Sequence, residues 1–111
     1  MSRTEIEVDS ATEQTVQEPS MYLVSILNDD YTPYEFVVVI LSGVFKHPIS
    51  QAVDLAGKAH EEGQAIVGRY TKEIAETLVD RATRLARGEG FPLSFAIEPE
   101  PQAKPSSGPS P

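Results

Sequence analysis

The sequence contains no cysteine, which excludes a disulfide framework and any metal site built from thiolates. It also contains no apolar run close to the roughly 18 residues that a membrane-spanning helix needs. Residues 1–20 lack the basic-then-apolar order of a secretion signal. We therefore expect a cytoplasmic protein that does not enter a membrane.

Basic residues are scarce, since 9 Lys and Arg stand against 17 Asp and Glu and the net charge is −8. Nucleic-acid-binding domains carry a basic face, so this balance argues against a nucleic-acid partner. Two histidines do not complete a closed zinc site, and the run Asn28-Asp29-Asp30 lacks the spaced acidic loop that binds calcium. No G-x-S-x-G motif is present. We expect no metal, no cofactor and no catalysis.

The apolar residues gather between Met21 and Ile97, so we expect one domain over 21–98. Residues 1–20 are acidic and poor in large apolar side chains, and residues 99–111 are rich in proline and serine. Both compositions are typical of disordered segments.

The apolar pattern within the domain predicts six elements. A short apolar strand over 22–27 ends at polar turn residues, and Thr32-Pro33-Tyr34-Glu35 then matches a capping box that starts a helix running to about residue 45. The later elements are a helix from Pro48 to Gly63, a strand over 64–70, a helix from Thr71 to Gly88 and a strand over 93–97.

Two of these helices carry apolar stripes at three- and four-residue spacing. On the second helix the stripe is Ile49, Ala52, Val53, Ala56, Ala59 and His60. On the third helix it is Ile74, Ala75, Leu78, Val79, Ala82, Leu85 and Ala86. The order βααβαβ predicts an α+β fold in which three helices cover one face of a three-stranded antiparallel sheet.

The polar residues after the first strand suggest a binding site. Asn28 and Asp29 offer amide and carboxylate acceptors, and His60 is the only histidine inside a predicted helix. An amide, a carboxylate and an imidazole at the opening of one binding site suit a small cation such as an ammonium better than they suit catalysis.

The run Asn28-Asp29-Asp30-Tyr31-Thr32-Pro33, with Glu35-Phe36-Val37-Val38 after it, closely resembles the ClpS adaptor family of bacterial proteases. The resemblance covers nearly all of 21–97. It continues through Gln51-Ala52-Val53, His60, Gly63, Gly68, Tyr70-Thr71, Glu73-Ile74-Ala75-Glu76-Thr77 and Pro92-Leu93. The fold of that family agrees with the βααβαβ order read from the sequence.

This resemblance implies a substrate adaptor that is not an enzyme. Proteins of this family bind substrates whose first residue is Leu, Phe, Tyr or Trp, and they deliver them to the AAA+ unfoldase ClpA, through its N-terminal domain, for degradation by ClpP. Asn28, Asp29 and His60 are then expected to bind the N-terminal amine. The apolar pocket for the first side chain is expected to consist of Asp30, Thr32, Tyr34, Val37, Ala56, Ala59 and Leu93.

The pocket departs from the family pattern in three places. Tyr34 stands where a methionine gate is usual, Ala56 where methionine or leucine is usual, and Ala59 where valine is common. We expect a changed preference among the four first residues, either towards aromatic side chains that stack on Tyr34 or towards a narrower range if Tyr34 fills the pocket.

The resemblance also places the unfoldase contact on the third helix, at Glu73 and Leu78. Leu78 stands where lysine is common and also lies on the apolar stripe, so it is either a core residue or an exposed contact. The acidic segment 1–20 resembles the extension that the family uses for delivery.

Two other interpretations remain open at the level of sequence. A ribosomal-stalk-like interaction domain has a similar α/β layout, but it does not need Asn28, Asp29 and His60 together. A small hydrolase using Asp29 or His60 predicts turnover, whereas an adaptor predicts binding alone.

Overall fold

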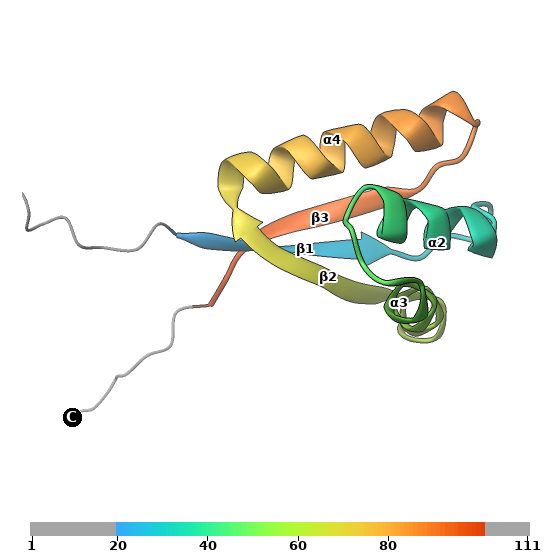
Figure 1. Ribbon diagram of the computed structural model, residues 1–111, viewed down its shortest axis with the longest axis horizontal. Helices are drawn as coiled ribbons and strands as arrows, with labels where there is room; N and C mark the ends of the chain where they lie inside the picture. Colours follow the sequence, from blue (N-terminus) through green and yellow to red (C-terminus); the bar gives the residue numbers. More distant parts are fainter. Residues whose placement is uncertain (1–19, 102–111) are drawn as a thin grey trace, which may run out of the picture.

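A computed structural model describes residues 20–101 of the chain. The predictions for the two tails fall almost wholly outside these residues. The elements follow one another in the predicted order, which confirms the α+β class (Figure 1). They are β1 (Met21–Leu27), α2 (Tyr34–Gly43), α3 (Ile49–Glu62), β2 (Gln64–Thr71), α4 (Lys72–Gly88) and β3 (Ser94–Pro99).

The sheet has the strand order β2-β1-β3, and both pairings are antiparallel. The β1–β2 register shifts between Val24 and Ser25, which pair with Gly68 and Ile66. The strand β3 runs to Pro99, and the Glu100 N–H donates to the Met21 carbonyl over 2.9 Å. Regular structure therefore continues just past position 98, where the sequence suggested that the domain ends.

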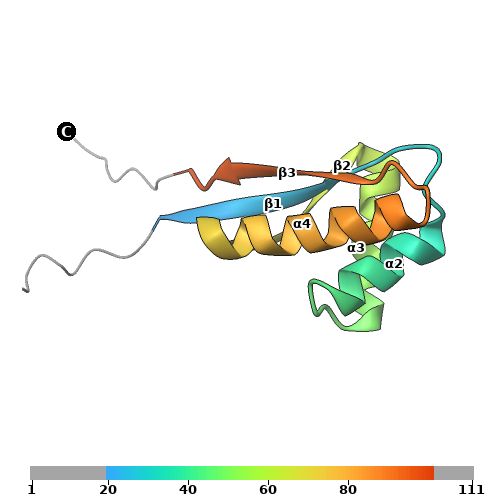
Figure 2. The same cartoon turned by 90° about the horizontal axis from the view of Figure 1, so that it is seen from above.

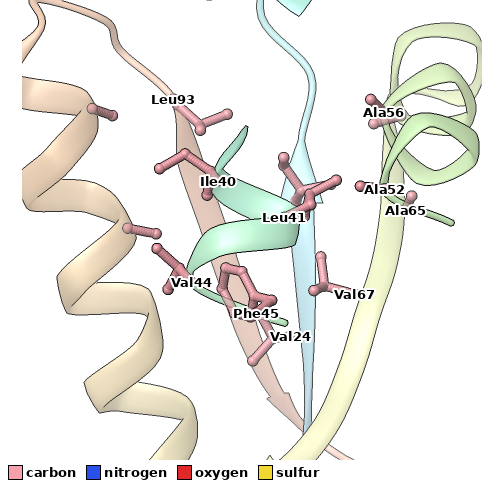
Figure 3. Close-up of a cluster of buried hydrophobic side chains, with 14 of the residues drawn as sticks. Val24, Ile40, Leu41, Val44, Phe45, Ala52, Ala56, Ala65, Val67 and Leu93 are labelled. Carbon is pink, nitrogen blue, oxygen red and sulfur yellow. The ribbon is translucent and has the colours of Figure 1, made fainter. Parts of the chain in front are cut away.

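The helices α2 and α4 lie on the same side of the sheet, and α3 crosses near the start of β2 (Figures 1 and 2). The core between these layers combines large side chains of β1 and α2 with small ones of α3 and α4 (Figure 3). Ile26, Ile40 and Leu41 are at most 2% exposed. The buried residues of α3 and α4 are all alanines, namely Ala52, Ala56, Ala59, Ala75, Ala82 and Ala86.

The predicted apolar stripes were too broad. The side chains of Ile49, Val53, Ile74 and Leu85 are 62%, 39%, 50% and 48% exposed, and His60 is exposed as well. Alanine side chains let a helix backbone approach its neighbours closely. Only a narrow line of residues then lies in the contact, and larger side chains beside that line remain at the solvent boundary.

The predicted capping box at the start of α2 was also wrong. Pro33 has an extended conformation, with φ −62° and ψ 143°, and occupies the N-cap position without a side-chain hydrogen bond. The Thr32 hydroxyl donates instead to Asp29 Oδ2. The predicted caps at Thr71 and Gly63 are confirmed, since Thr71 Oγ1 accepts from the Ile74 N–H and Gly63 has φ 93°. The helix α2 ends at Gly43, before the expected residue 45.

Candidate functional site

A cavity of about 320 Å³ opens where the end of β1, the helices α2 and α3 and the loop before β3 meet. Its lining residues are Ile26, Leu27, Asn28, Asp29, Asp30, Thr32, Tyr34, Val37, Ala56, Ala59, His60 and Leu93. The volume is within the usual range of small-ligand sites, about 300–1,000 Å³. Every residue that the sequence suggested for the amine or for the apolar pocket thus lines the same cavity.

Two further residues, Ile26 and Leu27, line the cavity although they were not among those predicted from the sequence. They are the last two residues of β1 and directly precede Asn28. The signal for them was present, because a strand that ends in the polar residues of a site brings its own last side chains to the same place.

The apolar wall is well packed. Leu93 and Ile26 are 1% exposed, and Ala56 and Ala59 are 4% exposed. The two alanines project from the buried face of α3, so the cavity reaches the helix backbone where a longer side chain would fill it. This wall suits a large apolar or aromatic group.

Asp29 organises the polar turn between β1 and α2. Its Oδ1 accepts from the N–H groups of Tyr31 and Thr32, each at 2.8 Å, and its Oδ2 accepts from the Thr32 hydroxyl at 2.8 Å. A carboxylate has about four acceptor positions. Three are used within the turn, and one, on Oδ2, is left for a donor from outside.

The ionised form of Asp29 is favoured by its surroundings. Partial burial of the carboxyl raises its pKa, but the hydrogen bonds from Tyr31 and Thr32 and the charge of Arg87 outweigh this effect. The pKa of Asp29 therefore lies below its usual value, and the turn presents a fixed negative charge at neutral pH.

Asn28 and His60 come from different parts of the fold, and both line the cavity. The Asn28 N–H donates to the Gly63 carbonyl over 2.9 Å, which ties the end of β1 to the end of α3. His60 lies in the last turn of that helix. Both residues are exposed, and among residues 20–101 neither side chain has a hydrogen-bond partner, so both are available to a ligand.

Tyr34 lines the cavity from the first turn of α2. Its hydroxyl donates to the Val53 carbonyl of α3 over 2.9 Å, and the residue is 46% exposed. The ring is therefore held across the junction of the two helices while the cavity beside it stays open. No sequence pattern indicates this hydrogen bond, which joins residues 19 positions apart.

The two residues suggested for the unfoldase contact lie on α4 and do not line the cavity. Glu73 is exposed in the first turn of the helix. Leu78 is partly buried and packs against the core.

Over residues 20–101, no group of three or more His, Asp or Glu side chains is placed to hold a metal ion. No helix in that range is long and apolar enough to cross a membrane.

Comparison with known proteins agrees with this geometry. The family model described as "ATP-dependent Clp protease adaptor protein ClpS" matches residues 17–96. A ClpS 1 adapter protein of Rhodopseudomonas palustris is 46% identical over 85 residues, which are 77% of this chain and 82% of that protein. A ClpS 2 adapter protein of Mesorhizobium japonicum is 44% identical over 84 residues, or 76% of this chain and 83% of that protein.

A solved structure is similar as well. It is that of Agrobacterium tumefaciens ClpS2 bound to L-phenylalaninamide. The two chains are 44% identical and superpose with a TM-score of 0.73 over 75% of this chain and 100% of the other. The chain belongs to the ClpS family of ATP-dependent Clp protease adaptors. The comparisons do not favour the ribosomal-stalk alternative.

Proposed function

We propose that this chain is a cytoplasmic adaptor that binds proteins through a free N-terminal Leu, Phe, Tyr or Trp and delivers them to a ClpA-type unfoldase for degradation by ClpP. It breaks no bond itself. One observation carries the proposal: acceptors for an ammonium and a wall for a large apolar side chain line a single cavity. The similar Agrobacterium protein was solved with L-phenylalaninamide, which has a free amine next to an aromatic side chain.

The polar residues suit an α-amino group. A free N-terminus has a pKa of about 7.7–8.0, so it is largely an ammonium with three donors at neutral pH. In the proposed complex, Oδ2 of Asp29 takes one donor, the Asn28 side-chain oxygen takes another, and His60 takes the third directly or through water. Hydrogen bonds to charged groups contribute roughly 1.5–3 kcal/mol each.

Burial of the first side chain against the apolar wall contributes a binding free energy of similar size. Burying a large apolar side chain is worth about 1.5–3 kcal/mol. Two or three such terms, reduced by the cost of ordering the peptide, correspond to dissociation constants on the order of micromolar. That affinity suits a carrier that must release its cargo.

The direct test is binding of a fluorescent peptide that begins with a free Phe, next to the same peptide acetylated at its N-terminus. We expect micromolar affinity for the first peptide and a loss of about 100-fold or more for the second, because acetylation removes the charge and two of the three donors. Fluorescence anisotropy measures both affinities.

Equal binding of the two peptides would contradict recognition of a free N-terminus. If none of the Phe-, Tyr-, Trp- and Leu-starting peptides bound, the protein would have the fold of the family but would not recognise these N-terminal residues.

We expect Tyr34 to shift the preference among first residues towards aromatics. Its hydrogen bond to Val53 holds the ring beside the open cavity, where it is placed to stack on an aromatic guest. In the wild type, Phe-, Tyr- and Trp-starting peptides should bind several times more tightly than the Leu-starting peptide. The variant Tyr34→Phe loses the hydrogen bond but keeps the ring. It should reduce the ratio of the affinity for aromatic-starting peptides to that for the Leu-starting peptide by about two- to fivefold.

Titrating the four peptides against both proteins measures the effect. Equal affinity of the wild type for all four, or an unchanged ratio in Tyr34→Phe, would contradict this role. Tyr31→Phe is the matched control, because Tyr31 is 79% exposed and does not line the cavity.

Delivery is proposed to use α4 on a surface separate from the cavity. We propose that Glu73, which is exposed in the first turn of α4, contacts the unfoldase N-terminal domain and that the exposed part of Leu78 extends this contact. The acidic segment 1–20 is proposed to assist delivery by entering the unfoldase; residues 1–19 lie outside the part that the structure describes.

A further inference from the structure

Arg87 lies in the last turn of α4 and is not among the residues that line the cavity. Its Nη1 atom donates two hydrogen bonds of 2.8 Å, one to the Phe91 carbonyl and one to the Leu93 carbonyl. Each hydrogen on this nitrogen thus has its own acceptor. The guanidinium fixes the loop that leads from α4 into β3 at two points.

That loop carries a wall of the cavity. Leu93 is 1% exposed and lines the cavity, and it has no regular strand partner because β3 begins at Ser94. Phe91 is held from the other side, where its ring meets Phe36 of α2 edge to face with centroids 4.9 Å apart. Arg87 and Phe36 therefore clamp the segment 91–93 between α4 and α2.

Arg87 also faces the turn that carries the ammonium acceptor. Together with Tyr31 and residues 90–92 it lines a second, open hollow of about 510 Å³, and Tyr31 belongs to the turn that Asp29 organises. The positive charge of Arg87 acts on Asp29 and lowers its pKa, after the larger effects of burial and hydrogen bonding. One side chain thus reaches towards both halves of the site, the apolar wall and the carboxylate.

We infer that Arg87 is a positioning residue for N-terminal recognition, which it supports by holding Leu93 in the cavity wall through its hydrogen bonds to the Phe91 and Leu93 carbonyls. The inference rests on the proposed function, and it assigns a role to a residue that does not line the cavity. A flexible loop would have to order Leu93 each time a first side chain bound, whereas the clamped loop presents it already in place.

The test compares Arg87→Met with Arg84→Met in the full chain. Both variants remove one positive charge from the same helix, but within residues 20–101 Arg84 pairs only with the exposed Asp80, one turn earlier on α4. For a peptide that begins with a free Phe, we expect Arg87→Met to bind about tenfold more weakly, because anchoring by two charge-assisted hydrogen bonds is lost. Arg84→Met should stay within about twofold of the wild type.

A double-mutant cycle with Leu93→Ala distinguishes positioning of Leu93 by Arg87 from a general weakening of the structure. If Arg87 acts through Leu93, Arg87→Met should lower the peptide affinity by less than about threefold when Leu93 is already alanine, because substitutions of residues in contact do not have additive effects. If Arg87→Met only weakened the structure in general, it would lower the affinity by about tenfold both with Leu93 present and with Leu93→Ala. Circular dichroism checks that each variant is folded, and Arg87→Gln replaces Arg87→Met in the cycle if the latter does not fold.

Wild-type-like affinity of Arg87→Met, or full additivity with Leu93→Ala, would overturn the positioning role. Failure of the wild type to bind the free Phe peptide would instead overturn the proposed function. The two failures are distinguished because the first concerns the variants alone and the second is visible before any variant is made.

Discussion

Replacing Asp29 by alanine is expected to weaken binding of a peptide with a free N-terminal Phe by about 100-fold or more. The change removes the carboxylate that is proposed to accept a hydrogen bond from the ammonium. It also removes three hydrogen bonds that hold Tyr31 and Thr32 in the turn. Loss of the carboxylate and disorder of the turn both weaken binding, so the decrease in affinity should exceed that from removing one charged hydrogen bond. Fluorescence anisotropy with the wild type and the variant measures it.

The variant Asp29→Asn separates the two causes. Its side-chain oxygen still accepts from the backbone of the turn, but the charge is lost, and we expect a smaller effect of about tenfold. Asp54→Ala is the matched control, because Asp54 is an exposed carboxylate on α3 outside the cavity lining. Should Asp29→Ala bind as tightly as Asp54→Ala, recognition of the ammonium by Asp29 would be refuted.

Replacing Leu41 by alanine is expected to lower the free energy of unfolding by about 2–5 kcal/mol. Leu41 is 0% exposed and projects from α2 into the core between the sheet and the helices (Figure 3). Truncation leaves a void that the surrounding side chains do not fill. In a domain of this size each kcal/mol shifts the melting temperature by roughly 4–8 °C, so a decrease of about 10 °C or more should appear in a thermal melt.

Val39→Ala is the control on the same helix, since Val39 is 59% exposed, and its effect should be within about 0.5 kcal/mol. Leu41 does not line the cavity. At a temperature where the Leu41→Ala variant is still folded, its affinity for the Phe peptide should therefore equal that of the wild type. Equal stability of the two variants would mean that the core tolerates the void, and a loss of affinity would mean that the core and the cavity are coupled.

The sequence by itself determined the order of the elements and the place of the polar site. A short apolar strand followed by Asn28 and Asp29 has few local alternatives, because such side chains favour turns over strands. Gly63 and Thr71 likewise mark helix ends through local backbone chemistry, and the structure confirms both. The pocket wall was named through the resemblance to the ClpS family and not through spacing, since no local rule brings Leu93 next to Ala56.

Only the tertiary structure decided which of several compatible partners each side chain takes. The local pattern at Thr32 predicts a helix cap, in which its hydroxyl oxygen accepts from a helix N–H, but Pro33 occupies the N-cap position and the Thr32 hydroxyl donates to the Asp29 carboxylate. Ile74 and Leu85 matched a core stripe, but they are 50% and 48% exposed, and the fully buried residues of α4 are all alanines, which let the helix approach the sheet.

The contacts of Tyr34 with Val53 and of Arg87 with Leu93 join separate elements. Periodicity describes only one element at a time, so such contacts cannot be read from it. They exist because packing around a shared core brings these parts of the chain together. The walls of the cavity come from the end of β1, from α2 and α3 and from the loop before β3, and their positions relative to one another are therefore a property of the folded chain.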